Sequence, residues 1–421
     1  MQPENPQNSG QKEEQFLRRC FQHFYQDNFI KGPPQTESRE FGYGVFGRKI
    51  ANRNLAFASE KEFNNFLRQQ VPFFISSSAA LYRFPEKRPT EAKEFLGSDL
   101  IYEFDADELQ TECKQTHDSW LCPKCGKSGK GRQLACDECG SAAKLEEWFC
   151  PECIGAAKQK VFSLLDFLEN DFGFSDGIAI NFSGRAGYHV HVRSDSVRNL
   201  PHAARIELID YLTANQLSIF SHFKKEETFF TGPPSKGKSG WPARILAELS
   251  SLLEEADSEK IAVMGNIPIA GARRLVREKA SILKSIRERN TIPAIFGKVS
   301  SKAESKSDLF WQSFLSSIVA KIAPIDRQTS VDLSKIIRVP ETIHGETGLI
   351  AKTVSKESLK EFNPFDDALA FKSEETVKVF INKAPSIYLA GEKFGQFEKQ
   401  EAELPLNAAV FLLAGNAAKL L

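Results

Sequence analysis

The chain has 421 residues, of which 41% are hydrophobic and 26% charged, a composition typical of a globular protein with two or three domains. Its 55 basic residues equal its 55 acidic ones, so bulk charge does not favour nucleic-acid binding, and any phosphate-binding surface must be a local patch. No apolar run approaches the ~20 residues that a membrane helix needs, so we expect no membrane-spanning helix.

The N-terminal third predicts a tail followed by alternating helices and strands. Residues 1–14 are polar and lack the apolar core of a secretion signal, so we expect a disordered tail. Phe and Leu recur with helical spacing over residues 15–30. Strand-like stretches follow around 41–47 and 53–57, and a helix is predicted near 60–70.

The next elements surround a cysteine-rich segment. The strand-like stretches "VPFFISSSAALY" and "LIYEFDADEL" precede this segment, and an amphipathic helix is predicted over residues 155–174. The stretch "GIAINFSGRAGYHVHVRS" then reads as a strand, a turn with two glycines and a second strand.

Helices dominate the following part of the chain, at 203–216, 242–256, 272–289 and 308–323. After residue 324 short strands return, and the chain ends in the helical pattern "NAAVFLLAGNAAKLL". We therefore predict an α/β (α+β) core of residues 15–200 and 324–421, interrupted by a mostly helical insertion over 201–323.

Two aspartates at the end of an apolar strand are the first candidate site residues. On a strand, Asp105 and Asp107 of "LIYEFDADEL" would lie on one face, roughly 7 Å apart. Two carboxylates on one face repel each other, which folding alone does not require. Carboxylate oxygens bind Mg²⁺, and such a pair with a third carboxylate can hold two metal ions for phosphoryl transfer.

The turn of "SGRAGYHVHV" gathers side chains that commonly bind phosphate. Ser183, Arg185 and His189 are all of this type, and Arg offers a fork of donors that matches phosphate oxygens. His191 would share a strand face with His189, and we interpret it as a supporting or core histidine.

The stretch "IDRQTSVDLSKIIRVPETIHGETGL" adds two aspartates, followed by Arg338 and His344. Asp332 precedes a short apolar stretch and fits the N-cap of a helix. Because this structural role explains the residue, we do not expect it to bind a metal. Asp326 has no such structural explanation.

Seven of the eight cysteines lie in one short segment, residues 113–153. Without a secretion signal we expect a reducing intracellular compartment, where C-x-x-C pairs are metal ligands more often than disulfides. The motifs "CPKCG" and "CDECG" have the pattern of a zinc ribbon with the ligands Cys122, Cys125, Cys136 and Cys139. Four further candidate ligands remain, namely Cys113, His117, Cys150 and Cys153.

The D-x-D, S-G-R-x-G-x-H and "IIRVPETIHGETGL" motifs follow one another along the chain in this order. With them the chain resembles the DNA primase small catalytic subunit of archaea and eukaryotes, most closely its archaeal form. The segments "SREFGYGVF", "ANRNLAF", "EFNPFDDALAF" and "LPLNAAVFLL" are also similar to that family, so the resemblance spans most of the chain. It implies a primase-type catalytic core with a zinc-binding insertion.

The resemblance implies roles for individual residues. Asp105 and Asp107 would bind two catalytic ions, Mg²⁺ or Mn²⁺. The family's third aspartate lies eighteen residues before the motif histidine, which places it at Asp326 and not at Asp332. The contacts to the triphosphate of the incoming nucleotide would come from Ser183, Arg185, His189, Arg338 and His344.

Two positions depart from the family pattern. Some relatives carry a second basic residue where this chain has Ala186, and archaeal members often read H-G-K where this chain has His344-Gly345-Glu346. Glu346 would place an acid beside the triphosphate, and it does not affect the metal site.

The zinc ligands allow two pairings. The family has one zinc knuckle here, with a late W-x-C-x-x-C that "WFCPEC" resembles. This favours a nested arrangement, in which residues 113, 117, 150 and 153 form one site around the ribbon. In the sequential alternative, the first four and the last four ligands form the two sites. Both pairings predict two structural Zn²⁺ ions.

The resemblance implies the catalytic subunit of a DNA primase, which starts chains de novo from nucleoside triphosphates on a single-stranded DNA template. It also implies a heterodimer with a primase large subunit that carries an iron–sulfur cluster. Two alternatives remain open: a primase-polymerase of repair or of a mobile element, and a catalytically inactive zinc-ribbon protein that binds nucleic acid.

Overall fold

The computed structural model describes residues 6–215, 217–218, 222–226, 228–232, 239–295, 306–323, 325 and 332–421. The described residues form two compact units. Unit 1 takes Met1–Val161, Asp176–Leu200 and Gln328–Leu421, and unit 2 takes Phe162–Ser175 and Pro201–Arg327. The division between Val161 and Phe162 falls inside the helix Pro151–Asn170 and does not coincide with a predicted domain limit. The predicted limits near residues 200 and 324 stay predictions.

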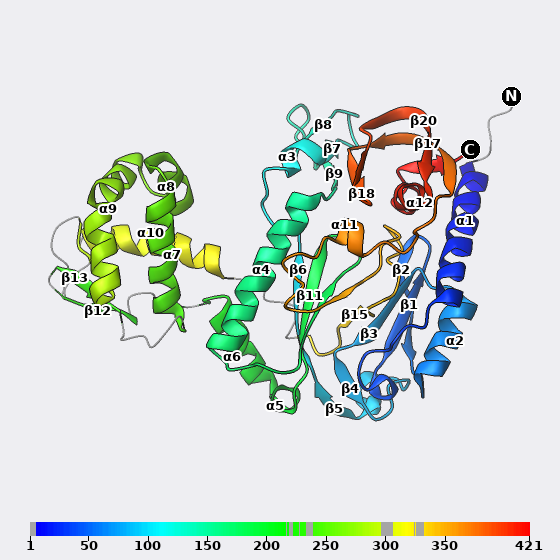
Figure 1. Ribbon diagram of the computed structural model, residues 1–421, viewed down its shortest axis with the longest axis horizontal. Coiled ribbons are helices and arrows are strands. Elements are labelled where there is room, and N and C mark those ends of the chain that lie inside the picture. The colour runs from blue at the N-terminus through cyan, green and yellow to red at the C-terminus, as the bar shows by residue number, and fades with distance from the viewer. Residues whose placement is uncertain are drawn as a thin grey trace. The chain divides into compact units, whose positions relative to one another are not determined.

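Two four-stranded sheets lie at the centre of unit 1 (Figure 1). The first has the strand order β15-β3-β1-β2, with β1 Phe41–Val45, β2 Arg48–Leu55, β3 Phe74–Ser78 and β15 Ile336–Arg338. The second has the order β16-β10-β11-β6, with β6 Leu100–Asp105, β10 Ile178–Phe182, β11 Gly187–Val192 and β16 Thr353–Val354. All these pairs are antiparallel.

Buried side chains join the two sheets. Ile101 of β6, Ile337 of β15 and Ala79, which follows β3, pack in one apolar cluster. The cluster therefore brings β6, which ends at Asp105, close to β15, which carries Arg338, although the two strands are far apart in the sequence. The C-terminal part of the chain thus completes the core.

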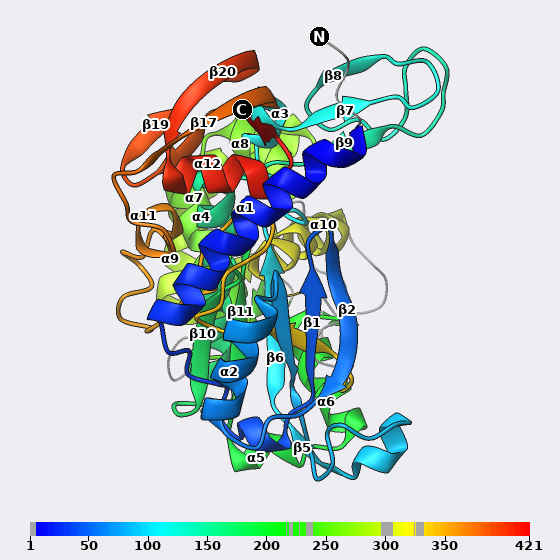
Figure 2. The same cartoon turned by 90° about the vertical axis from the view of Figure 1, so that its right-hand side faces the viewer.

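Helices cover unit 1, and Figure 2 shows α1 running diagonally across it past α12. The helices of unit 1 are α1 Pro6–Asp27, α2 Glu60–Gln70, α3 Lys114–His117, the first part of α4 Pro151–Asn170, α5 Asp195–Arg198, α11 Pro364–Asp367 and α12 Leu406–Ala414, with 3₁₀ turns η1 Thr36–Ser38 and η2 Thr90–Lys93. Since α1 begins at Pro6, the prediction of a disordered tail is wrong for residues 6–14.

Among the described residues, four smaller sheets complete unit 1. The cysteine-rich segment, residues 113–153, forms the sheet β8-β7-β9, with β7 Ser119–Leu121, β8 Ser128–Lys130 and β9 Lys144–Glu146. The others pair β4 Ala80–Tyr82 with β5 Phe95–Ser98, β18 Ile387–Leu389 with β19 Glu392–Phe394, and β17 Thr376–Ala384 with β20 Phe397–Pro405 and β21 Ala418–Leu420. The helix predicted at the C-terminus ends at Ala414, and a strand follows it.

Unit 2 is mostly helical, as Figure 1 shows for α7 to α10. Its elements are the end of α4, α6 His202–Leu212, α7 Trp241–Glu255, α8 Ser258–Gly265, α9 Ile269–Arg289, α10 Lys306–Ile322 and the sheet β12 Lys224–Lys225, β13 Phe229–Thr231 and β14 Thr291–Pro293. The sequence predicted the long helices of this unit and missed α8. With both units described, the mixed α/β class is confirmed.

Candidate active site and metal centres

The candidate catalytic aspartates lie where β6 meets the turn that leads into β11. Asp105 is the last residue of β6 and pairs with Gly187, the first residue of β11. A Cβ on Gly187 would lie 2.5 Å from the Asp105 carboxylate, so only glycine allows this close approach. Asp105 thus faces the turn that carries Arg185.

Asp107 lies outside the strand, which corrects the prediction that both aspartates share a strand face. The strand ends because Glu108 N donates to Asp105 O at 3.1 Å and closes a turn. Asp107 Oδ2 accepts a hydrogen bond of 2.8 Å from Arg185 Nη1. The turn therefore places the carboxylate of Asp107 against the arginine of the second motif.

Burial raises the pKa of Asp105, and the nearby carboxylates of Glu103 and Asp107 raise it further, while His189 and Arg185 act in the opposite direction. An acid whose pKa is raised by folding binds its proton more tightly in the folded state. The negative charge at neutral pH therefore costs stability, as expected for a group that a bound cation neutralises.

We expect Asp105→Asn to raise the free energy of unfolding at pH 7 by about 1 kcal/mol in urea without added divalent ions. The amide removes a charge that the folded site disfavours. The gain should disappear as the pH falls towards 4, because the native carboxyl is then protonated in the folded state and increasingly in the unfolded state. A destabilised variant at pH 7 would show that the Asp105 charge is well accommodated without metal.

The turn between β10 and β11 is held by its own first residue. Ser183 Oγ accepts from Gly187 N at 3.1 Å and from Arg185 N at 3.4 Å. Gly184 has φ +85°, and a Cβ there would lie 2.7 Å from the Cβ of His344. The turn therefore packs directly on the third motif, and the structure brings the second and third motifs together.

His344 and Arg338 present buried donors at this place. His344 Nδ1 accepts a hydrogen bond of 3.2 Å from Glu346 N, so the proton of the neutral ring is on Nε2. Burial, with the positive charges of Arg338, Arg185 and Lys49, holds the pKa of His344 well below its usual range. The histidine is thus a neutral hydrogen-bond donor.

Arg338 is half-buried, and two nitrogen atoms of its guanidinium are buried without a hydrogen-bond partner among the described residues. These atoms are Nε and Nη1, and the group lies 4.9 Å from the centre of the Phe74 ring. Burial lowers its pKa to about 10, so the side chain is still charged at neutral pH. Buried guanidinium nitrogens without a partner are costly, and an anionic ligand would satisfy them.

The two histidines of β11 are both buried. His189 Nε2 lies 3.7 Å from Glu103 Oε1, and burial lowers the pKa of His189. His191 Nε2 has no hydrogen-bond partner among the described residues, and burial lowers the pKa of His191 well below its usual range. Burial therefore favours the neutral form of both rings.

The candidate third aspartate, Asp326, lies outside the described residues. Asp332 is described, and its predicted role as a helix N-cap is wrong. Its Oδ1 accepts from Ser334 N at 2.9 Å and caps a turn before the strand β15, because "IIRV" pairs with β3 instead of forming a helix.

Sequence reasoning missed three neighbours of this site. Lys335 forms an ion pair with Glu103, and Lys49 on β2 lies 3.2 Å from Glu346. The other oxygen of Glu346 lies 3.5 Å from Arg185 Nε. These contacts join residues far apart in the sequence, so spacing carries no signal for them. The acid at 346, flagged as a departure from the family, is thus paired with two cations.

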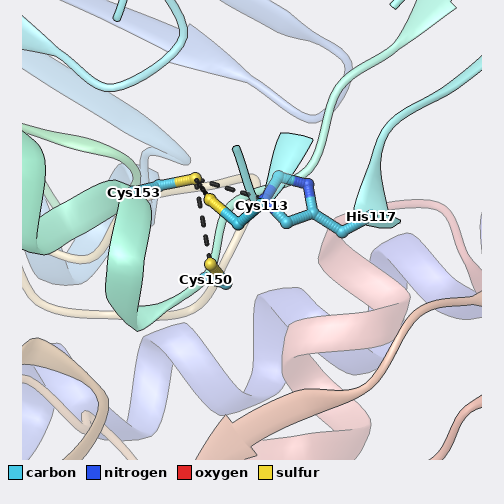
Figure 3. Close-up of side chains that lie close together, drawn as sticks. All are labelled: Cys113, His117, Cys150 and Cys153. Atoms are coloured by element: carbon cyan, nitrogen blue, oxygen red, sulfur yellow. Dashed lines mark hydrogen bonds between the residues drawn. The ribbon is translucent and has the colours of Figure 1, made fainter. Parts of the chain in front are cut away.

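The eight candidate zinc ligands form two clusters in the nested arrangement. The first cluster, shown in Figure 3, contains Cys113, His117, Cys150 and Cys153. Cys153 Sγ lies 3.4 Å from Cys113 Sγ, 3.9 Å from Cys150 Sγ and 3.2 Å from His117 Nε2. Two sulfurs bound to tetrahedral zinc at about 2.3 Å would lie about 3.8 Å apart, and a histidine nitrogen would lie somewhat closer to each sulfur because the Zn–N bond is shorter. The spacings of this cluster therefore fit zinc.

A carboxylate orients the histidine of this first cluster. Asp118 Oδ1 lies 2.8 Å from His117 Nδ1 and also accepts from Trp148 N at 3.0 Å. A carboxylate on the far nitrogen of a metal-binding histidine fixes the ring and its tautomer. The nitrogen that faces the three sulfurs is therefore left free to bind a metal.

The second cluster contains Cys122, Cys125, Cys136 and Cys139. The Sγ atoms of Cys122 and Cys139 are 3.5 Å apart, and those of Cys125 and Cys136 are 3.6 Å apart. Trp120 packs with Cys122 and Cys136 in a small apolar core of the ribbon. Both clusters could hold zinc, and the sequential pairing of ligands is not the one found.

Residues 144–355, about half of the chain, match the family model described as the DNA primase small subunit. The chain is 30% identical over 419 residues to the DNA primase small subunit PriS of Methanothrix thermoacetophila, with 95% of this chain and 96% of the relative covered. It belongs to the DNA primase small subunit family. The archaeal resemblance read from the motifs is confirmed.

Other members of the family are similar over nearly their whole length. The primase small subunit of Methanosarcina mazei is 27% identical over 438 residues, with 96% of each chain covered. That of Archaeoglobus fulgidus is 27% identical over 401 residues, with 94% of this chain and 96% of the relative covered. Among the described residues, no helix is long and apolar enough to cross a membrane.

Proposed function

We propose that this chain is the catalytic subunit of a DNA primase, a nucleotidyltransferase that synthesises short primers de novo from nucleoside triphosphates on single-stranded DNA. The observation that carries the proposal is the meeting of two carboxylates, Asp105 and Asp107, with the buried donors Arg338 and His344 around the turn of Arg185. The two carboxylates of this group of residues suit divalent cations, and its donors suit phosphates.

Asp105 and Asp107 are the proposed ligands of two Mg²⁺ or Mn²⁺ ions, with Asp326 as the third carboxylate. The donor set fits these ions, because they prefer carboxylate oxygens and because the raised pKa of Asp105 indicates an uncompensated negative charge. The ions, when bound, lower the pKa of the attacking 3′-hydroxyl and neutralise charge on the α-phosphate and the departing pyrophosphate.

A second set of side chains, which donate hydrogen bonds, would bind and orient the triphosphate. Arg185 and Arg338 supply charged donors, and neutral His344 supplies its Nε2–H. Ser183 keeps a hydroxyl proton to donate while its oxygen accepts from the turn, and His189 would complete the set. When a metal ion binds the carboxylate of Asp107, Arg185 would leave Asp107 and bind phosphate instead.

We further propose two structural Zn²⁺ ions, because each cluster offers four ligands and no open position for a substrate. The proposed partners are a primase large subunit, implied by the names of the relatives as small subunits, and the single-stranded template. A primer-synthesis gel tests the function: purified chain, single-stranded DNA, labelled ribo- or deoxyribonucleotides, and Mg²⁺ or Mn²⁺, with and without large subunit.

Labelled products that depend on template and divalent ion would support the proposal. Synthesis only when a primer is supplied would favour a repair-type polymerase. Template binding without any product, in the presence of the large subunit, would favour the inactive zinc-ribbon protein and contradict the assignment.

We expect Glu346→Gln to lower the KM for nucleoside triphosphates about two- to fivefold. The carboxylate pairs with Arg185 and Lys49, and its removal frees both cations for phosphate; a half-exposed ion pair of this kind has a free energy of up to about 1 kcal/mol. Lys49→Ala should change KM in the opposite direction. Glu361→Gln, on an exposed residue, is the matched control, and a raised KM in Glu346→Gln would mean that the acid helps to bind nucleotide.

A further inference from the structure

The main-chain carbonyl of Asp107 is held by two cations that both come from the cysteine-rich segment. Lys114 Nζ donates to Asp107 O at 2.8 Å, and Arg132 Nη1 donates to the same oxygen at 3.1 Å. A carbonyl oxygen has two lone pairs, and two charge-assisted hydrogen bonds use both of them. Lys114 is 2% exposed, so its ammonium group is committed to this contact. The segment that contains both cysteine clusters therefore also holds the backbone of a candidate catalytic aspartate.

The first of these cations depends on the first cysteine cluster. Lys114 opens α3, a single turn that is preceded by Cys113 and ends at His117. A helix of four residues is not stable by itself, so its conformation depends on what fixes its two ends. Both ends are ligands of the first cluster. A zinc ion bound there would fix the turn from which Lys114 reaches Asp107.

The second cation is connected to the same cluster through a carboxylate. Arg132 forms an ion pair with Glu147, and its Nε lies 3.7 Å from Asp118 Oδ2. The other oxygen of Asp118 lies 2.8 Å from Nδ1 of the zinc-ligand candidate His117. A continuous series of polar contacts thus runs from His117 through Asp118 and Arg132 to Asp107.

Asp107 needs such support because it lies beyond the end of β6. Asp105 is fixed by its pairing with β11, whereas Asp107 lies in a turn, where its carboxylate forms an ion pair with Arg185. That arginine is expected to move towards phosphate when nucleotide binds. Metal ligands must be held to within about half an ångström, which a turn without outside contacts does not provide.

We propose that the cysteine-rich segment positions Asp107 for binding of the catalytic metal, with Lys114 and Arg132 as the positioning residues. The proposal rests on the proposed function, since it takes Asp107 as a metal ligand. It gives the cysteine-rich segment a role in the affinity of a second, different metal site.

The test is a titration with Mn²⁺ in the absence of nucleotide, with free Mn²⁺ followed by electron paramagnetic resonance and zinc measured by elemental analysis. The full-length protein with its zinc is used. We expect Arg132→Met to raise the Mn²⁺ concentration for half-saturation about three- to tenfold while both zinc ions are retained. The matched control Lys124→Met removes an exposed cation from the same ribbon and should change neither quantity.

The sign of the change separates positioning from simple electrostatics. Arg132 is positively charged, so if it acted only through its charge, its removal would tighten binding of a cation. Weaker binding in Arg132→Met supports positioning. Unchanged or tighter binding overturns it, and so does loss of zinc in this variant, because the arginine would then belong to the zinc site itself.

A second variant tests the connection to the zinc cluster. Asp118→Asn keeps an oxygen that can accept from Trp148 N and removes the charge that faces Arg132. It should weaken Mn²⁺ binding in the same direction, and the double variant with Arg132→Met should be no weaker than Arg132→Met alone, as for two residues in one chain of contacts. Additive effects would overturn the connection through Asp118.

The proposed function fails in a different way. If Asp107→Ala binds as much Mn²⁺ as the unaltered protein, the metal site itself is misassigned, and the positioning role is overturned with it. If Asp107→Ala loses Mn²⁺ and Arg132→Met does not, only the positioning role is overturned.

Discussion

Asp107→Ala will reduce nucleotide incorporation by about a thousandfold or more, which corresponds to about 4 kcal/mol of lost transition-state stabilisation. The carboxylate contacts Arg185, where it can bind a cation, and it makes no contribution to the apolar core. The free energy of unfolding should change by less than about 0.5 kcal/mol, as for most surface substitutions. Primer extension and urea unfolding on the same preparation measure both quantities.

Asp332→Asn is the matched control for this experiment. It removes one carboxylate from the same unit, and an asparagine oxygen can still cap the turn at Ser334. Its activity should stay within about twofold of the unaltered protein, whereas Asp326→Asn should be nearly inactive if that residue is the third ligand. Normal incorporation by Asp107→Ala would contradict the two-metal proposal.

The second large effect is expected at the first cysteine cluster. Cys153→Ser should remove one zinc ion and destabilise unit 1 by several kcal/mol, because structural zinc binding is itself folding free energy. Cys153 is fully buried and lies within 4 Å of the other three ligands. Zinc content by elemental analysis, together with thermal unfolding, tests this expectation.

The double variant Cys122→Ser/Cys136→Ser provides the comparison for Cys153→Ser. In the nested arrangement it removes two ligands from the ribbon site alone, so one zinc ion should remain and the core should stay folded. In the sequential arrangement the same two changes would fall on different sites, and both ions would be lost. A protein without zinc would therefore contradict the pairing found in the structure.

The sequence was most informative where a local pattern carries the information. Strand alternation and flanking turns located β6, β10 and β11, and C-x-x-C spacing identified six of the eight ligands that the two clusters contain. The other two, Cys113 and His117, were candidates because they lie just before these pairs in the sequence. It misplaced Asp107 and Asp332 because strand ends and helix caps are decided by pairing partners. The partner of "IIRV" is β3, more than 250 residues earlier in the chain, as the pairing of Ile336 with Ser78 shows.

Sequence patterns could not predict the long-range contacts of the candidate site. Glu346 meets Lys49, and Arg132 meets Asp107, across loops of the chain whose course only the folded structure gives. The family resemblance implies roles for Arg185 and His344 that stay predictions, whereas the neutral tautomer of His344 follows from a single hydrogen bond with Glu346 N.

The nesting of the two cysteine clusters sets an order in which the chain can take up its metals. The ribbon site joins sulfurs 17 residues apart, and the first cluster joins sulfurs 40 residues apart. Closing the longer loop in a flexible chain costs about 0.8 kcal/mol more conformational entropy. Once the inner loop is closed, most of that extra length no longer has to be ordered. The ribbon site should thus bind its metal before the first cluster does. The last zinc to bind would then be the one that is proposed to fix the contacts of Lys114 and Arg132 with Asp107.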